Sequence, residues 1–230
     1  MKILPISLNL HTKETKCPCP KPKFSFTQDV VSFSSKKPKV TKNDIYPLYS
    51  ERTIQRSIQK TAQKINEHYK DEPVTTICLL KGADMFNTDL AKHLDMPVTM
   101  EYEKLSSYVG TESTGRVTEA GLFNLERARG KNILIVEDVI DTGKTLTDYK
   151  KKIEEHDPKS VKIVVLCDKI SDRRKEYTVK PDFSCIKLVG DDYIVGYGMD
   201  YNQQFRNLPY IGGINKEKLQ EIADYESSQG

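Results

Sequence analysis

Three carboxylates stand beside a glycine turn in the stretch ILIVEDVIDTGKTL, residues 133–146. Glu137 and Asp138 end an apolar run, and Asp141 follows three residues later, directly before Thr142. Such a turn ahead of a helix offers backbone N–H groups and hydroxyls, the donors that bind a phosphate. Carboxylates at the end of an apolar strand are costly unless something pairs with them. The stretch therefore predicts a binding site in which both the turn and the acids have partners.

A nucleotide-hydrolysing P-loop is one alternative, because Gly143, Lys144 and Thr145 read GKT. That motif needs another glycine five positions before the glycine of GK, where this chain has Asp138. An ordinary strand–turn–helix connection is the second alternative, and it would account for the turn alone. It leaves the acids at the strand end unexplained, so we favour a ligand site.

The surrounding chain predicts strands that alternate with helices. Helices are expected over residues 51–69 and 83–94, and from the glycine turn onward with Leu146, Tyr149 and Ile153 on one face. Strands are expected over residues 75–80, 97–102, 132–137, 161–167, 183–189 and 193–198. Because the central strands are apolar throughout, we predict an α/β fold with a parallel twisted sheet flanked by helices. Right-handed crossovers then bring the loops after the central strands to one edge of the sheet, where ligands bind.

Charge is unevenly distributed along the 230 residues, which are long enough for one good-sized core or one domain with an appendage. The net charge is +3, but residues 1–40 contain eight lysines and two acids, so the rest of the chain carries −3. The main body therefore has no basic bias towards nucleic acid, and we expect no such partner. No run approaches the roughly 18 apolar residues of a membrane span, so no membrane partner is expected either.

The beginning of the chain is rich in proline, serine and lysine and shows no sustained period. We expect residues 1–43 to form a disordered basic extension and residues 44–230 to form the functional domain. An organelle-targeting role stays open, although the apolar stretch 3–10 has no convincing cleavage site and the segment has no arginine. The five cysteines show no C-x-x-C spacing, so we expect a reduced, cytoplasmic protein without a structural metal.

Residues 133–146 closely resemble the phosphoribosyl-pyrophosphate-binding motif of the type I phosphoribosyltransferases: an apolar strand, two acids, apolar residues and Asp-Thr-Gly-Lys-Thr. Other segments resemble the hypoxanthine-guanine members of that family, in their compact bacterial form. These segments are LLKGAD (79–84), SSY (106–108), LCDKISDRR (166–174) and DDYIVGYGMDYNQQFRNLPYIG (191–212). The resemblance extends from about residue 44 to 213. It implies the type I phosphoribosyltransferase fold, with a small C-terminal hood formed mainly by about residues 183–215.

The resemblance implies an enzyme of purine salvage that joins hypoxanthine or guanine to 5-phosphoribosyl-1-pyrophosphate, giving IMP or GMP and pyrophosphate. The turn from Asp141 to Thr145 would wrap the 5′-phosphate of the sugar. Glu137 and Asp138 would accept hydrogen bonds from the ribose 2′- and 3′-hydroxyls. Asp141 would also exchange the proton at purine N7 as a general acid/base. The acids and the turn would thus bind different parts of one sugar.

Four residues are implied for the purine. Lys169 would donate to the exocyclic O6, and an ammonium group, which only donates, suits that acceptor. Tyr193 would stack on the ring, while Ile194 and Asp200 would offer main-chain groups near the base. From the residues alone, Lys169 could also be a solvent-exposed lysine, and Tyr193 could be a core aromatic.

The pyrophosphate end has its own implied residues. Main-chain groups of Lys81 and Gly82 would contact it, and the peptide bond before that lysine is often cis in the family. Arg206 would bind it directly, and Ser107 and Tyr108 would reach over it from the polar stretch 104–119. That stretch would cover the site during turnover and exclude water.

A Mg²⁺ cofactor on the pyrophosphate is implied, with Glu137, Asp138 and Asp200 near the metal. Asp84 departs from the family pattern by adding a negative charge close to the pyrophosphate, and Tyr193 replaces the phenylalanine of many relatives.

Two other functions stay open: a related enzyme acting on xanthine or a pyrimidine, and a regulator that keeps this fold but binds nucleic acid. A homodimer or homotetramer is expected from the resemblance.

Overall fold

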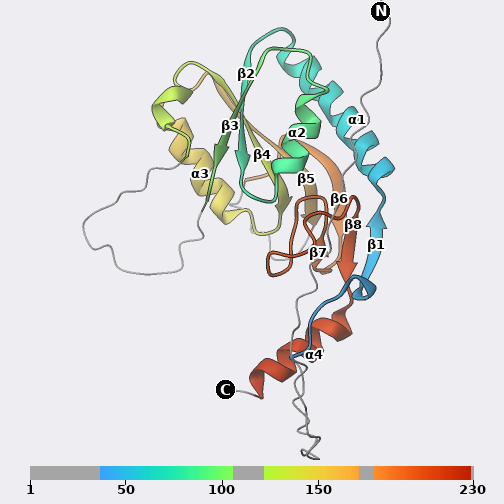
Figure 1. Ribbon diagram of the computed structural model, residues 1–230. Helices are drawn as coiled ribbons and strands as arrows, with labels where there is room; N and C mark the ends of the chain where they lie inside the picture. The colour runs from blue at the N-terminus through green and yellow to red at the C-terminus, as the bar shows by residue number, and fades with distance from the viewer. Residues whose placement is uncertain (1–36, 106–121, 171–178, 229–230) are drawn as a thin grey trace, which may run out of the picture. The chain divides into compact units, whose positions relative to one another are not determined.

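The computed structural model describes residues 37–105, 122–170 and 179–228. A five-stranded parallel sheet with the order β3-β2-β4-β5-β6 forms its centre (Figure 1). These strands are β2 (Val74–Leu79), β3 (Val98–Glu103), β4 (Asn132–Ile140), β5 (Ser160–Ile170) and β6 (Phe183–Val189). The predicted α/β fold with a parallel sheet flanked by helices is confirmed.

Helices cover both faces of this sheet (Figure 1). On one face lie α1 (Glu51–Tyr69) and α2 (Asp84–Ala91), and on the other lie α3 (Lys144–Glu154) and the short 3-10 helix η2 (Leu125–Ala128). Side chains of β4 alternate between the two cores: Leu134 packs with the α1 face, and Ile135 packs with the α3 face. The strands read as continuous apolar runs because both of their faces are buried.

Helix α1 begins and ends at the predicted residues. The side chain of Ser50 accepts a hydrogen bond from the Thr53 N–H and caps the first turn. The buried stripe recurs at helical spacing and consists of Ile54, Ile58, Thr61, Ala62, Ile65 and Tyr69. Lys70, with a φ of 54°, ends the helix.

A second, antiparallel sheet lies beyond the main one and was not predicted as such. Its order is β1-β8-β7, formed by β1 (Ile45–Tyr49), β8 (Ile211–Ile214) and β7 (Ile194–Val195). Helix α4 (Lys216–Ser227) follows β8. The range 183–215 that we assigned to the hood is therefore shared between two sheets. Strand β6 belongs to the main sheet, and the small sheet contains β7 and β8 together with β1 from the start of the domain.

The packed body begins earlier than residue 44. Val40 is buried with Ile45, Leu208 and Ile222, and the 3-10 helix η1 (Lys42–Asp44) follows it. Residues 37–43 are therefore part of the fold, because Val40 buries apolar surface that a free extension would leave in water. The expectation of a disordered extension otherwise concerns residues 1–36, which lie outside the described residues.

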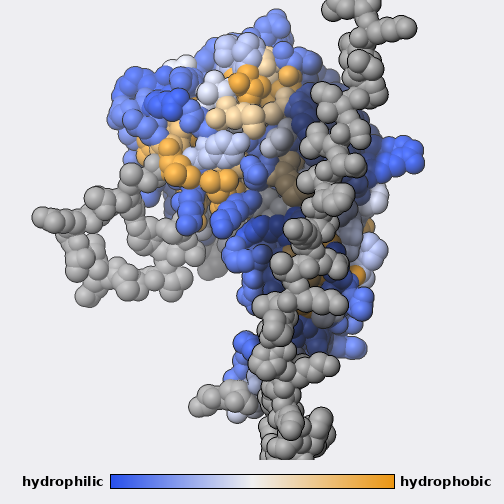
Figure 2. All heavy atoms as spheres, in the orientation of Figure 1, coloured by the Kyte–Doolittle hydropathy of each residue, from blue (hydrophilic) through white to orange (hydrophobic). Residues whose placement is uncertain are grey.

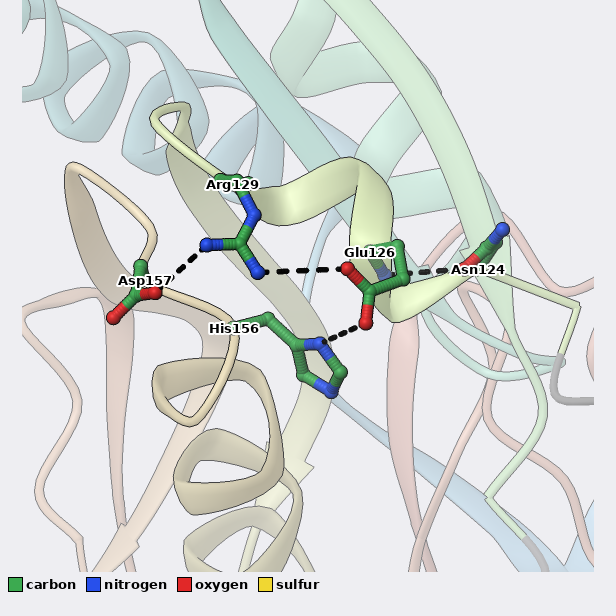
Figure 3. A network of polar contacts seen from close by, with 5 residues as sticks. All are labelled: Asn124, Glu126, Arg129, His156 and Asp157. Carbon is green, nitrogen blue, oxygen red and sulfur yellow. Dashed lines mark hydrogen bonds and ion pairs between the residues drawn. The ribbon is translucent and has the colours of Figure 1, made fainter.

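A polar network joins η2 to the end of α3 (Figure 3). Glu126 forms an ion pair with Arg129 at 3.6 Å and contacts His156 Nδ1 at 3.1 Å, while Arg129 also pairs with Asp157 at 2.8 Å. Asn124 Oδ1 accepts the Glu126 N–H. Since these groups are largely exposed, each contact stabilises the fold only slightly. Together they link η2 to the residues that follow α3.

Candidate active site

A cavity of about 290 Å³ lies at the carboxyl ends of β2 and β4. Leu79, Leu105 and Leu146 give it apolar walls. Its polar lining comes from Glu137 and from the turn of residues 141–145. The cavity is therefore at the edge of the sheet where the sequence predicted ligand binding.

The turn ends at the N-terminus of α3, and Gly143 occupies the N-cap position with a φ of 71°. Among the described residues, no side chain caps this helix, and its first turn contains no acidic residue. By contrast, Ser50 caps α1 and Asn215 caps α4, and both of those helices have an acid in the first turn. The N–H groups at the start of α3 are thus open to an external anion, and the positive end of the helix dipole favours one.

The acidic pair lies inside a strand that is longer than predicted. Strand β4 continues to Ile140 because Val139 and Ile140 pair with Cys167 and Asp168 of β5. Glu137 is consequently held in the sheet, and its Oε2 atom is buried without a hydrogen-bond partner in the part of the chain that the structure describes. Burial, followed by the charge of the adjacent Asp138, raises the pKa of Glu137 well above its ordinary value.

Burial also raises the pKa of Asp138. Its Oδ1 atom accepts the Val139 N–H at 2.8 Å, which opposes that shift. The two carboxyls thus lie side by side in a desolvated place. Hydroxyl donors or a cation from a ligand would relieve this cost.

This burial predicts a pH dependence of stability. Because the pKa of Glu137 is raised in the folded state, the native protein keeps a proton at pH values where the unfolded chain has already released it. The free energy of unfolding therefore falls as the pH rises from the unfolded-state pKa towards the folded-state pKa. We expect the melting temperature of the ligand-free protein to fall as the pH rises above about 4.5, the ordinary pKa of a glutamate, and Glu137→Gln to reduce the fall. Thermal unfolding across this range is the measurement. Glu155→Gln, at an exposed position past α3, serves as the control; an equal effect of both substitutions would contradict the assignment.

Gly82 brings the turn after β2 against the acidic pair. The Leu80–Lys81 peptide is cis, in agreement with the family resemblance. A Cβ atom on Gly82 would lie 1.7 Å from Asp138 Oδ2, so only glycine leaves room for that carboxyl. On the other side, a Cβ atom on Gly198 would lie 2.1 Å from the Gly82 carbonyl oxygen. The turn is therefore packed between Asp138 and the loop after β7.

Arg206 and Asp200 lie together on that loop. The guanidinium of Arg206 pairs with Asp200 Oδ1 at 2.6 Å and donates to the Gly198 carbonyl at 2.8 Å. Asp200 Oδ2 accepts the Gln203 N–H at 2.7 Å. The positive charge of Arg206 also lowers the pKa of Asp138 against the effect of burial. The structure thus brings the charge of Arg206 into electrostatic reach of Asp138.

The residues expected to bind the purine do not line the cavity. Lys169 is only 7% exposed and donates to the Asp192 carbonyl at 3.0 Å, so the solvent-exposed alternative is wrong. Tyr193 is 46% exposed and meets Tyr201 edge to face at 5.4 Å, so it is no core aromatic. Ile194 is buried in β7. This region therefore presents a buried lysine beside an accessible aromatic ring.

Ser107 and Tyr108 lie outside the described residues. Within the described ranges, no three acidic, histidine or cysteine side chains gather as a ready-made metal site. Glu137 and Asp138 still fit Mg²⁺, because this ion typically binds one or two carboxylates together with substrate phosphates and water.

A family model described as "Phosphoribosyl transferase domain" matches residues 47–204. The chain belongs to the phosphoribosyltransferase family. Among its curated relatives, a hypoxanthine-guanine-xanthine phosphoribosyltransferase of Tritrichomonas foetus is 41% identical over 75% of this chain and 92% of its own length. A hypoxanthine-guanine phosphoribosyltransferase of Staphylococcus epidermidis is 37% identical over 74% of this chain and 93% of its own.

Solved structures of other phosphoribosyltransferases agree with the fold. A hypoxanthine-guanine phosphoribosyltransferase of Bacillus anthracis aligns with a TM-score of 0.64 at 33% identity, covering 74% of this chain and 98% of its own. Sequence analysis missed two contacts that this phosphoribosyltransferase chain uses to arrange its site: the Asp192 carbonyl that holds Lys169, and Gly198 behind Gly82. Neither contact has a local sequence signal beyond the glycine itself.

Proposed function

We propose that this phosphoribosyltransferase is an enzyme of purine salvage that joins hypoxanthine or guanine to 5-phosphoribosyl-1-pyrophosphate, the sugar donor. The observation that carries the proposal is the shared cavity, in which an uncapped helix N-terminus lies together with Glu137, whose carboxyl stands beside that of Asp138. An anion and a pair of hydroxyls on one molecule complement these two features. The names of the relatives support the same chemistry.

Each end of the donor has its own residues. The 5′-phosphate accepts from the N–H groups and hydroxyls of Thr142, Gly143, Lys144 and Thr145. The ribose hydroxyls donate to Glu137 and Asp138. The pyrophosphate meets the main chain of Lys81 and Gly82 and the guanidinium of Arg206, with Ser107 and Tyr108 as further ligands. This division explains why negative side chains stand beside a phosphate-binding turn.

Magnesium completes the pyrophosphate site in this proposal. Glu137 and Asp138 would hold it together with the substrate oxygens, and Asp200, whose oxygens already bind Arg206 and Gln203, would support it from nearby. When bound, the ion neutralises the charge that develops on the departing pyrophosphate.

Asp141 is the proposed general acid/base. It lines the cavity at the first position of the turn. It exchanges the N7 proton of the purine while N9 bonds to the sugar and pyrophosphate leaves, giving IMP or GMP. Pyrophosphate release from the donor with hypoxanthine, guanine, xanthine and adenine in turn tests the function. Release with the 6-oxopurines alone supports it, and no release with any base would contradict it.

Lys169 is the residue proposed to recognise the 6-oxo group, and its replacement should change the kinetics in a defined way. Lys169→Met removes the ammonium donor proposed for O6, and a hydrogen bond to a charged group is worth about 2 kcal/mol, or roughly 30-fold. We expect kcat/KM for hypoxanthine to fall by this factor while KM for the sugar donor is unchanged. Lys187→Met, at an exposed position of the neighbouring strand β6, is the control. An equal loss in both variants would contradict the role of Lys169.

Xanthine is a second candidate substrate, because the Tritrichomonas foetus relative carries xanthine in its name. Xanthine shares the 6-oxo group, so Lys169 would serve it equally. The same series of bases tests this candidate. Turnover of xanthine at a rate similar to that of guanine would give this chain the substrate range in the relative's name, whereas turnover of hypoxanthine and guanine alone would exclude xanthine as a substrate.

We also propose a cytoplasmic homo-oligomer, either a dimer or a tetramer. Hydrophobic residues gather on the surface over the β2 and β3 side of the main sheet (Figure 2). The exposed large hydrophobic side chains include Met100 on β3, Met85 on α2 and Leu122, each at least 36% exposed. Strand β3 is an edge of its sheet, and exposed edges are commonly covered by another chain.

The cysteines within the described ranges are free thiols, and no helix there is long and apolar enough to cross a membrane. Sedimentation analysis would measure the assembly.

A further inference from the structure

Glu103 is a buried carboxylate to which the mechanism above gives no task. It ends β3 and is 4% exposed. Its Oε1 atom accepts the N–H of Lys104 at 2.7 Å and the N–H of Leu122 at 3.1 Å. Its Oε2 atom accepts the Tyr149 hydroxyl at 3.4 Å, a long hydrogen bond within the buried interior. One side chain therefore joins the end of β3 to Leu122 and Tyr149, which are 19 and 46 residues further along the chain.

Each of these points borders the site. Leu105, one residue after Lys104, lines the cavity, and so does Leu146, one turn before Tyr149 on α3. The main-chain oxygen of Glu103 also accepts the Leu80 N–H at 2.8 Å, at the start of the turn that contains Gly82. Burial and the nearby Glu103 charge raise the pKa of Tyr149, so its hydroxyl keeps the proton it donates.

We propose that Glu103 is a positioning residue for the sugar-donor site: its side chain holds the start of the cavity-lining segment at residues 104–105, the chain at Leu122 and the phosphate-binding helix α3 in fixed mutual positions. Burying a carboxylate costs free energy. Here three hydrogen-bond donors, together with the place of the residue at the end of β3, offset that cost. Its contribution to the reaction acts through other residues, because the side chain binds Lys104, Leu122 and Tyr149 instead of the turn or the acidic pair. The proposal rests on the proposed function only in naming the ligand of that site.

Three substitutions separate this role from a merely structural one. Glu103→Ala removes all side-chain contacts. Glu103→Gln keeps the oxygen that accepts both N–H groups, and its amide nitrogen can donate to the Tyr149 hydroxyl. Tyr149→Phe removes only the link to α3. Glu101→Ala, two residues earlier on the same strand, is the matched control, because Glu101 instead pairs with Arg127.

For Glu103→Ala we expect the calorimetric dissociation constant and the KM of the sugar donor to rise roughly tenfold, with KM for the base unchanged. Tyr149→Phe should show a smaller rise of about threefold, and Glu103→Gln and Glu101→Ala should stay within about twofold of the wild type. Amide hydrogen exchange gives a readout that needs no ligand: in Glu103→Ala, exchange in residues 122–128 and 144–149 should become about tenfold faster.

The outcomes are distinct. A lower melting temperature with an unchanged donor dissociation constant would reduce Glu103 to a structural residue and overturn the proposal. Equal weakening by Glu103→Gln and Glu103→Ala would overturn it as well, since the tie survives in the former. If the wild type binds no sugar donor, the proposed function fails, whereas the hydrogen-exchange comparison still decides whether Glu103 joins these elements.

Discussion

Asp141→Asn lowers kcat by about 10²–10⁴-fold and leaves the fold intact, if Asp141 exchanges the proton at purine N7. The amide has nearly the shape of the carboxyl, so the turn at the N-terminus of α3 should still bind the 5′-phosphate. It cannot accept a proton at neutral pH, so the chemical step loses its acid/base. Steady-state kinetics with hypoxanthine measure kcat, and calorimetry with the sugar donor shows whether binding persists.

Asp148→Asn provides the matched control for this prediction. Asp148 is an exposed carboxyl on α3, seven residues along the chain and outside the cavity. Its replacement removes the same charge from the same region, so kcat should stay within about twofold of the wild type. An unchanged kcat in Asp141→Asn, or a parallel loss in both variants, would remove the proposed acid/base role.

Gly82→Ala should lower kcat/KM for the sugar donor by about 10²-fold. The new methyl group would lie 1.7 Å from Asp138 Oδ2, so either the carboxyl or the turn must move. Displacement of about 1 Å at a substrate-positioning group is enough for a loss of this size. The KM of the purine base should change little, because the base is expected beside Lys169 and Tyr193.

Gly130→Ala distinguishes crowding from a general effect of replacing glycine. Gly130 has a φ of 68°, and a Cβ atom there would meet nothing within 4 Å. We expect a lower melting temperature from backbone strain but unchanged kinetics. Normal donor kinetics in Gly82→Ala would show that the close approach to Asp138 is not needed for binding.

The main sheet could be predicted from the sequence because its signals are local. Helix α1 has a regular apolar period and a serine cap, and β6 is a short apolar run, so the bounds of both were predicted correctly. Strand β4 was predicted three residues too short, at 132–137, because the acids that follow its apolar run suggest a strand end. Pairing of Val139 and Ile140 with β5 extends the strand through them, which no local pattern reports.

The small sheet could not be predicted, because its strands depend on partners far along the chain. Strand β1 contains Pro47, and β8 contains Gly212 and Gly213, which are poor strand residues by propensity. The pairing works because the ring of Tyr46 packs on Gly213, where a Cβ atom would lie 2.5 Å from Tyr46 Cζ. Strand β7 is shorter than predicted because the backbone turns at Gly196, which has a φ of 92°.

The residues of the candidate site could likewise be predicted only where they are close together in the sequence. The motif of residues 137–145 is contiguous, so its residue types alone predict much of the polar lining of the cavity. Glu103 has no such signal, because its partners Leu122 and Tyr149 are 19 and 46 residues away. Only the folded chain shows that this carboxylate borders the site.

The most direct test of the account is a crystal structure of the wild-type protein with the sugar donor and Mg²⁺. We expect the 5′-phosphate about 2.7–3.2 Å from the N–H groups at the start of α3, with the ribose hydroxyls on Glu137 and Asp138. A 5′-phosphate bound away from residues 142–145, or hydroxyls that make no contact with the acidic pair, would contradict it.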